Sequence, residues 1–161
     1  MGNIFKKISP AVFGLTLICF ILPFVTVSCQ GQKIASFTGV QLMTGTTIKE
    51  PGSFGQQKTK KVDSEPTVLI AFLAGVAGLG ISFLKSKKSA IVPAGFGLIG
   101  LIMLLVMKYR LDNQILSEGG GMLQIDYDIG YWLTFLLYLL AIGFNGFIFF
   151  EGGNGKKEED K

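Results

Sequence analysis

Four long apolar runs divide the chain, and shorter polar segments separate them. None of the runs contains Asp, Glu, Lys or Arg; they cover residues 11–27, 67–84, 90–107 and 129–150. Each is close to the ~17–25 residues that cross a bilayer core, and none has the polar face of a soluble core helix. The pattern therefore predicts four transmembrane helices, at about residues 10–28, 66–85, 89–109 and 129–150.

The segments between the runs predict how these helices are connected. Lys85, Lys87 and Lys88 occupy a link after the second run that is long enough only for a tight turn between antiparallel helices. The whole chain is then one domain, residues 1–161, with an all-α membrane fold of four antiparallel transmembrane helices. Its remaining parts are two outer loops and a disordered tail, at about residues 29–65, 110–128 and 152–161.

The first outer loop has the composition of a β-hairpin at its start. β-Branched and aromatic residues lie on both sides of Gln30-Gly31-Gln32, and Gly between two such runs is typical of a hairpin turn. We therefore expect a small extracytoplasmic β-hairpin here. The polar, Lys- and Gln-rich stretch from Thr46 to Val62 is expected to be mobile.

Composition and charge agree with a membrane location. The chain is 49% hydrophobic and only 16% charged, whereas a soluble domain is about 25% charged. Its net charge of +4 comes from Lys clusters at segment ends, which is typical of membrane-flanking charge rather than nucleic-acid binding. The total Lys and Arg on the two sides do not decide the orientation. The clusters at Lys6-Lys7 and Lys85–Lys88 directly adjoin apolar runs, which favours both termini on the cytoplasmic side of an inner or plasma membrane.

Aromatic residues gather at the opposite side of the predicted membrane. Tyr109 follows the third run, and Tyr127, Tyr131 and Trp132 precede or begin the fourth. Such residues are enriched where a membrane meets water. They predict an interfacial aromatic belt.

The sequence has no arrangement of residues typical of an enzyme. It has no histidine, which removes the commonest metal ligand and the usual general base. Two cysteines cannot form a zinc site alone. No metal, cofactor or catalytic residue is predicted, although a lipid or pigment could bind without a motif. An enzyme would have to use the carboxylates of the second outer loop, which are Asp112, Glu118, Asp126 and Asp128.

Cys29 is a candidate for lipidation. Lys6-Lys7, the first apolar run and Val27-Ser28-Cys29 resemble a bacterial lipoprotein signal that ends in a lipobox. The resemblance implies an acylated Cys29 at a new N-terminus. Thr26 stands where Leu is usual, so an uncleaved signal-anchor helix with an unmodified Cys29 is the alternative.

Small residues recur within the last three runs and predict helix-packing faces, because they let backbones approach closely in lipid. The predicted packing residues, including one strongly polar residue, are Ala71, Ala74, Gly75, Gly78, Gly97, Gly100, Gly143, Asn145 and Gly146. The faces could pack within the bundle or dock onto another membrane protein. Asn145 is expected to hydrogen-bond across helices.

The organisation resembles the claudin-like group in topological outline. The phrase LPFVTVSCQGQ…SFTGVQLMTG also looks like small bacterial four-helix multi-pass membrane proteins. The claudin-like signature Trp-Gly-Leu-Trp-Cys-Cys is missing, because the first outer loop has no Trp and only Cys29. The resemblance implies a self-associating adhesion or pore-forming protein. The residues themselves favour a non-catalytic accessory or scaffold subunit that packs against a larger membrane protein, with the lipid bilayer as its surroundings.

Overall fold

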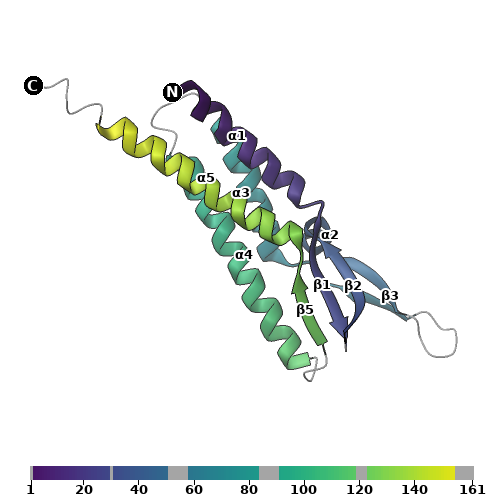
Figure 1. Cartoon of the computed structure of the whole chain (residues 1–161). Helices are drawn as coiled ribbons and strands as arrows, with labels where there is room; N and C mark the ends of the chain where they lie inside the picture. Colours follow the sequence, from purple (N-terminus) through teal and green to yellow (C-terminus); the bar gives the residue numbers. More distant parts are fainter. Residues whose placement is uncertain (1, 30, 51–57, 84–90, 119–122, 155–161) are drawn as a thin grey trace, which may run out of the picture.

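Four long helices form a bundle, and the strands gather at one end of it (Figure 1). The computed structural model describes residues 2–29, 31–50, 58–83, 91–118 and 123–154. Each long helix packs on two neighbours, in the ring order α1, α3, α4, α5. Their bounds are Gly2–Cys19 for α1, Pro66–Ser82 for α3, Ile91–Glu118 for α4 and Ile129–Asn154 for α5. The start of α1 and the end of α5 lie at the bundle end opposite the strands (Figure 1).

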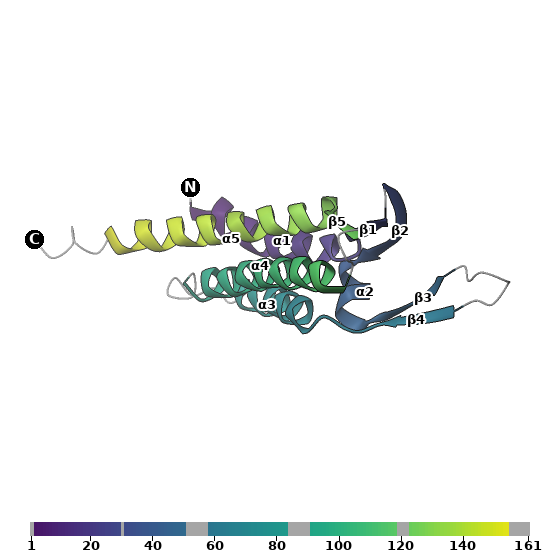
Figure 2. The same ribbon diagram turned by 90° about the horizontal axis from the view of Figure 1, so that it is seen from below.

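A three-stranded antiparallel sheet closes the other end of the bundle. Its central strand β1 (Pro23–Cys29) pairs with β2 (Gln32–Thr38) on one side and β5 (Leu123–Tyr127) on the other. The short helix α2 (Gly39–Thr44) follows β2. Then β3 (Thr46–Glu50) and β4 (Lys58–Val62) form a separate two-stranded ribbon, which Figure 2 shows extending away from the bundle. We call the end that carries the sheet and the ribbon the sheet end.

The prediction of an all-α fold with four transmembrane helices is wrong. Among the described residues, two helical segments are long and apolar enough to cross a membrane, Val92–Gln114 with 23 residues and Ile129–Phe147 with 19. The first two apolar runs form shorter apolar helices, Pro10–Cys19 and Pro66–Ser82. The all-α assignment fails as well, because the described residues form five strands.

The first predicted helix, at residues 10–28, ends early because Pro23 cannot continue it. The helix closes with a tight turn in which the Phe20, Ile21 and Leu22 amides donate to carbonyls three residues earlier. Proline has no amide hydrogen to donate and its ring clashes with the preceding helical turn. The β-branched residues that follow favour a strand. β1 lies between two other strands and packs against α5. A strand in such a buried position consists largely of apolar residues, so in the sequence it resembles a continuation of the apolar helix before it.

The predicted outer loops contain regular structure. The hairpin around Gly31, which has φ 81°, joins β1 to β2 as expected, but β5 adds a third strand from the second loop. In that loop, predicted at 110–128, α4 continues to Glu118 before β5 begins. Within the stretch expected to be mobile, the described residues 46–50 and 58–62 form the β3–β4 ribbon.

Some predictions concern residues outside the described part. These are the Lys85–Lys88 link and the section of the predicted disordered tail from 155 to 161. The first residues of that tail, 152–154, belong to α5.

Aromatic side chains fill the bundle interior where glycines make room for them. Tyr138 and Phe13 are fully buried. A Cβ on Gly100 would lie 2.5 Å from the Tyr138 ring, and a Cβ on Gly78 would lie 2.5 Å from the Phe13 ring. The Tyr138 hydroxyl donates to the Ala71 carbonyl at 2.5 Å and so links α5 to α3. At the sheet end, Phe20 and Phe24 continue this core, with ring centroids 5.1 Å apart.

Replacing Gly100 by alanine tests this packing. The added methyl must displace the Tyr138 ring, whereas Gly95→Ala on the same helix has nothing within 4 Å. Both variants gain the same helix propensity, about 1 kcal/mol, so their difference isolates the clash. We expect Gly100→Ala to be less stable than Gly95→Ala by about 1–3 kcal/mol, measured by thermal unfolding in detergent. Equal stability of the two variants would contradict this packing.

Candidate functional site

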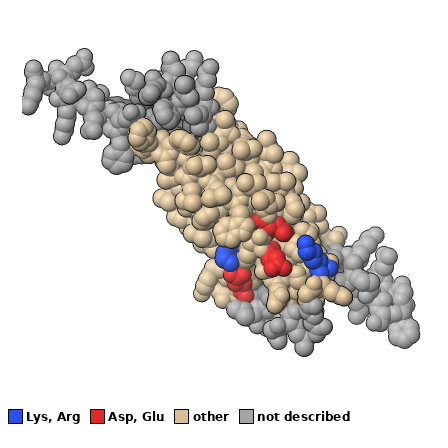
Figure 3. Space-filling view, viewed as in Figure 1, with Lys and Arg blue, Asp and Glu red and all other residues tan. Residues whose placement is uncertain are grey.

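The outer surface of the bundle is apolar on all four long helices. Its exposed side chains include Leu15 and Ile18 on α1, Leu69 and Leu73 on α3, Leu98, Ile102 and Leu105 on α4, and Leu133, Leu136 and Leu140 on α5. Only 28% of the α4 span and 39% of the α5 span are buried, which is little for core helices of a soluble protein. In the view of Figure 3, the charged residues among those described lie toward the sheet end, and the middle of the bundle has none. This surface is consistent with association with a membrane.

Three buried polar side chains within the helices bond to the backbone of their own helix. The hydroxyl of Thr16 donates to the Val12 carbonyl at 2.8 Å, and that of Thr134 donates to the Gly130 carbonyl at 2.7 Å. Asn145 Nδ2 donates to the Ala141 carbonyl at 2.7 Å, a bond within α5. The bond across helices that the sequence predicts for Asn145 stays a prediction. Such bonds to the carbonyl four residues earlier satisfy a polar group without water. They allow these side chains to lie in an apolar interior.

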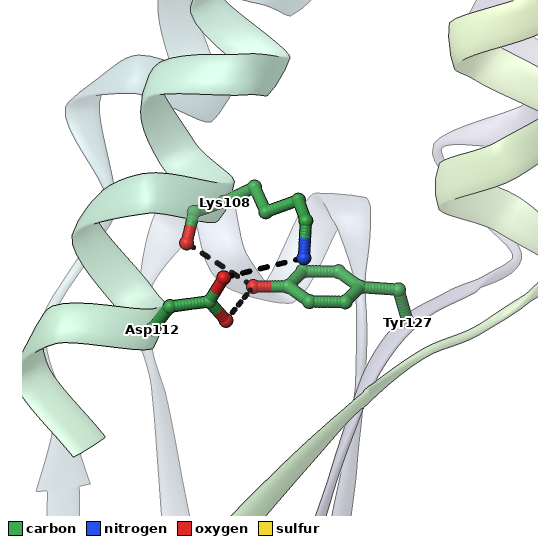
Figure 4. A network of polar contacts seen from close by, with 3 residues as sticks. All are labelled: Lys108, Asp112 and Tyr127. Atoms are coloured by element: carbon green, nitrogen blue, oxygen red, sulfur yellow. Dashed lines mark hydrogen bonds and ion pairs between the residues drawn. The ribbon is translucent and has the colours of Figure 1, made fainter. Parts of the chain in front are cut away.

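Three residues clamp β5 against the extension of α4 (Figure 4). The Tyr127 hydroxyl lies 2.7 Å from Asp112 Oδ1 and 3.2 Å from the Lys108 carbonyl, both of which accept from it. Lys108 Nζ is 3.2 Å from Asp112 Oδ2 and 4.0 Å from the centre of the Tyr127 ring. Burial raises the pKa of Tyr127 above its ordinary value, and the hydrogen bond to Asp112 and its charge raise it further. The phenol therefore keeps its proton and remains a donor.

Two further carboxylates join β5 to the polar face of the sheet. The Thr26 hydroxyl lies 2.5 Å from Asp128 Oδ2, and the Ser28 hydroxyl lies 3.1 Å from Asp126 Oδ2. Thr26 also lies 3.1 Å from the hydroxyl of Ser36 on β2. Both hydroxyls on β1 are buried. The two carboxylates, one on β5 and one just after it, therefore accept hydrogen bonds from β1, and the contact of Thr26 with Ser36 links β1 to β2.

An ion pair near the sheet end links the start of α3 to α4. Glu65 precedes α3, its side chain is only 15% exposed, and its Oε2 lies 3.8 Å from Arg110. The Glu65 amide donates to the Leu42 carbonyl at 2.8 Å. This contact holds α2 against the start of α3.

The residues considered for an enzyme therefore lie in separate contacts. Asp112 bonds Tyr127, Asp126 bonds Ser28 and Asp128 bonds Thr26, while Glu118 is the last residue of α4. In the described part of the chain, no three Cys, Asp or Glu residues gather in a group that could hold a metal ion. The contacts of Asp112, Asp126 and Asp128 hold strands and helices in position.

The predicted packing residues divide into two groups. Seven are buried inside the bundle, namely Ala71, Ala74, Gly75, Gly78, Gly97, Gly100 and Asn145. Gly75 and Gly100 lie against Tyr138, and Gly97 lies against Ile142. By contrast, a Cβ on Gly143 or Gly146 would meet nothing within 4 Å, and Gly143 is exposed. Sequence spacing alone does not separate the inner group from the outer pair.

The predicted aromatic belt is also divided. Tyr109 is 71% exposed and Trp132 is 49% exposed, as a membrane-facing position allows. Tyr131 is buried in the core, and Tyr127 bonds Asp112. The sequence did not predict that Tyr127 and Tyr138 act as hydrogen-bond donors inside the structure. The spacing of Lys108 and Asp112, four residues apart on a helix, was the available signal for part of this contact.

Cys29 lies at the end of β1, half-buried, with a free thiol. Its strand partners are Gln32 and Leu123. The residues before it form α1 and most of β1, which pack on α3, α5, β2 and β5. Processing before Cys29 would therefore remove one helix of the bundle and the central strand of the sheet.

Removing the Tyr127 hydroxyl tests the clamp at the sheet end. Tyr127→Phe keeps the ring beside Lys108 but leaves Asp112 Oδ1 without its phenol donor. We expect the free energy of unfolding to fall by about 1–2 kcal/mol, measured by chemical denaturation in detergent. The control is Tyr109→Phe, at a 71% exposed position, which should change little. An equal effect of both substitutions would show that the clamp contributes nothing of its own.

Comparison with models of known protein families and with curated proteins gives no match.

Proposed function

We propose that this chain is an integral, multi-pass protein of the cytoplasmic membrane and serves as a non-catalytic accessory or scaffold subunit of a larger membrane complex. The observation that carries the proposal is the apolar outer surface, which extends over four helices around a filled core. Such a large apolar surface marks contact with lipid or with another protein. Two of the helices, α4 and α5, supply the candidate spans.

The arrangement of charge supports an orientation. Charged side chains of the described residues lie toward the sheet end in the view of Figure 3, as expected where a membrane meets water. The start of α1 and the end of α5 lie at the opposite end (Figure 1). The sequence places Lys6 and Lys7 near the start of α1. Lysines next to membrane helices favour the cytoplasmic side, so we place both termini there and the sheet end outside.

The outer glycines of α5 support a partner rather than lipid alone. Gly143 and Gly146 have open space where a side chain would lie. Small outward residues let the backbone of another helix approach closely in a membrane. Three carboxylates of the sheet end, Asp112, Asp126 and Asp128, are engaged in structural contacts, which favours a scaffold role over catalysis.

A mild-detergent pull-down from the native membrane, followed by mass spectrometry, tests this proposal. We expect a larger membrane protein in stoichiometric amount. Gly143→Leu should release it, because the new side chain fills the space that a partner helix would need. The matched control, Gly95→Leu, adds the same bulk at another exposed helical glycine with nothing within 4 Å and should retain the partner.

The other outcomes of this pull-down decide against the scaffold role. Recovery of the chain alone would contradict it, as would equal retention of the partner by both variants. Recovery as a homo-oligomer would support the second candidate function.

The second candidate is self-association of the claudin-like kind. It is favoured by β2, an edge strand whose first three residues, Gln32, Lys33 and Ile34, are exposed. Unpaired strand edges can pair with another chain. Two irregularities in the β1–β2 register oppose this pairing, because bulges twist an edge away from partners. A pore along the bundle axis is disfavoured because Phe13 and Tyr138 fill the interior.

A further inference from the structure

A polar recess lies at the base of the β3–β4 ribbon. Its volume is about 480 Å³, within the range of roughly 300–1,000 Å³ typical of small-molecule sites. One wall comes from the end of α2 and the start of β3, and the other from the end of β4 and the link to α3. The lining residues are Thr44, Gly45, Thr46, Thr47, Lys61, Val62, Asp63 and Ser64.

The local backbone brings these two walls together. Gly45 has φ 77°, and a Cβ there would lie 3.0 Å from the Val62 carbonyl oxygen and 3.3 Å from the Ser64 amide nitrogen. In the ribbon, Thr46 is the strand partner of Val62, and Thr47 is the partner of Lys61. The recess is therefore built by strand pairing and a close backbone approach.

The recess offers hydrogen-bond donors with one ammonium group. Four of its eight lining residues carry hydroxyls, and Lys61 is exposed at its wall. The Thr44 hydroxyl already donates to the Val40 carbonyl at 2.9 Å, so the donors offered to a ligand are those of Thr46, Thr47 and Ser64. Asp63 is the opposing charge. Hydroxyls and an ammonium are the groups that bind phosphate oxygens by charge-assisted hydrogen bonds.

The sequence of the ribbon adds positive charge beside the recess. The described residues of β3 and β4 include four lysines and one glutamate, namely Lys49, Lys58, Lys60, Lys61 and Glu50. A local excess of positive charge raises the concentration of anions near it. Charge and hydroxyl content thus favour an anionic, oxygen-rich ligand.

We propose that this recess binds a phosphate ester, carried by the headgroup of an anionic phospholipid. The lipid source is favoured because Ser64, on the recess wall, is two residues before the apolar helix α3 begins at Pro66. This places the recess at the level where the apolar surface of the bundle meets its polar end. The inference goes beyond the scaffold role, because a phosphate ester can bind whether or not a partner protein exists.

The test uses the full chain in phosphatidylcholine nanodiscs and two probes. Glycerol 3-phosphate is titrated by calorimetry, and phosphatidylglycerol retained by the protein is counted by native mass spectrometry. Lys61→Gln removes the ammonium of the recess. Lys33→Gln removes the same charge from an exposed position on β2 that does not line the recess, and is the matched control.

We expect Lys61→Gln to weaken binding of phosphatidylglycerol about tenfold, as the loss of one charge-assisted hydrogen bond implies, and Lys33→Gln to leave it unchanged. Binding of phosphatidylglycerol alone identifies the lipid headgroup as the source. Binding of glycerol 3-phosphate as well, with the same dependence on Lys61, supports a phosphate site that also accepts soluble esters. The proposal is overturned if neither probe binds, or if both variants weaken binding equally. Matching melting temperatures of the two variants will show that both are folded.

Discussion

The structure depends on one buried hydrogen bond, from the Tyr138 hydroxyl to the Ala71 carbonyl. A phenol enclosed in an apolar bundle must find an acceptor there, because leaving it without one costs roughly 1–3 kcal/mol. The ring reaches that carbonyl only where Gly75 and Gly100 leave space beside it. This single side chain therefore sets the separation of α5 from both α3 and α4. Small residues are therefore needed inside the bundle beside the buried aromatic rings, while many other large apolar side chains lie on its outer surface.

The sheet end follows from the same requirement that polar groups be satisfied internally. α4 continues past the apolar surface, and its Asp112 receives the Tyr127 hydroxyl from β5. β5 in turn pairs with β1, where buried Thr26 and Ser28 donate to Asp128 and Asp126. The Asp112–Tyr127 bond thus joins two consecutive elements, whereas the bonds of Thr26 and Ser28 join residues about 100 positions apart in the sequence. The result is a polar end attached to an apolar bundle, as a protein at a membrane boundary requires.

The apolar runs predicted where the long helices lie but not how far they extend. Residues 24–28 form a buried strand, and an apolar run alone cannot distinguish a buried strand from a helix; Pro23 was the better signal. By contrast, α4 continues through the mostly polar residues 110–118, because a helix need not end where its apolar surface ends. For β5, the alternation in Leu123-Gln124-Ile125-Asp126-Tyr127 was a readable strand signal. Which aromatic ring faces which glycine depends on how the helices are rotated against one another, and no single-sequence pattern contains that information.

The central claim is that the apolar surface of α4 and α5 lies in a membrane with the sheet end at its boundary. Trp132, the only tryptophan of the chain, is 49% exposed near the start of α5. Its fluorescence can be measured in vesicles whose phospholipids carry bromine at defined depths along the acyl chain. Strong quenching by lipids brominated near the headgroup, and weaker quenching by those brominated near the bilayer centre, is the result that this account predicts. Fluorescence unaffected by bromine at any depth would contradict it.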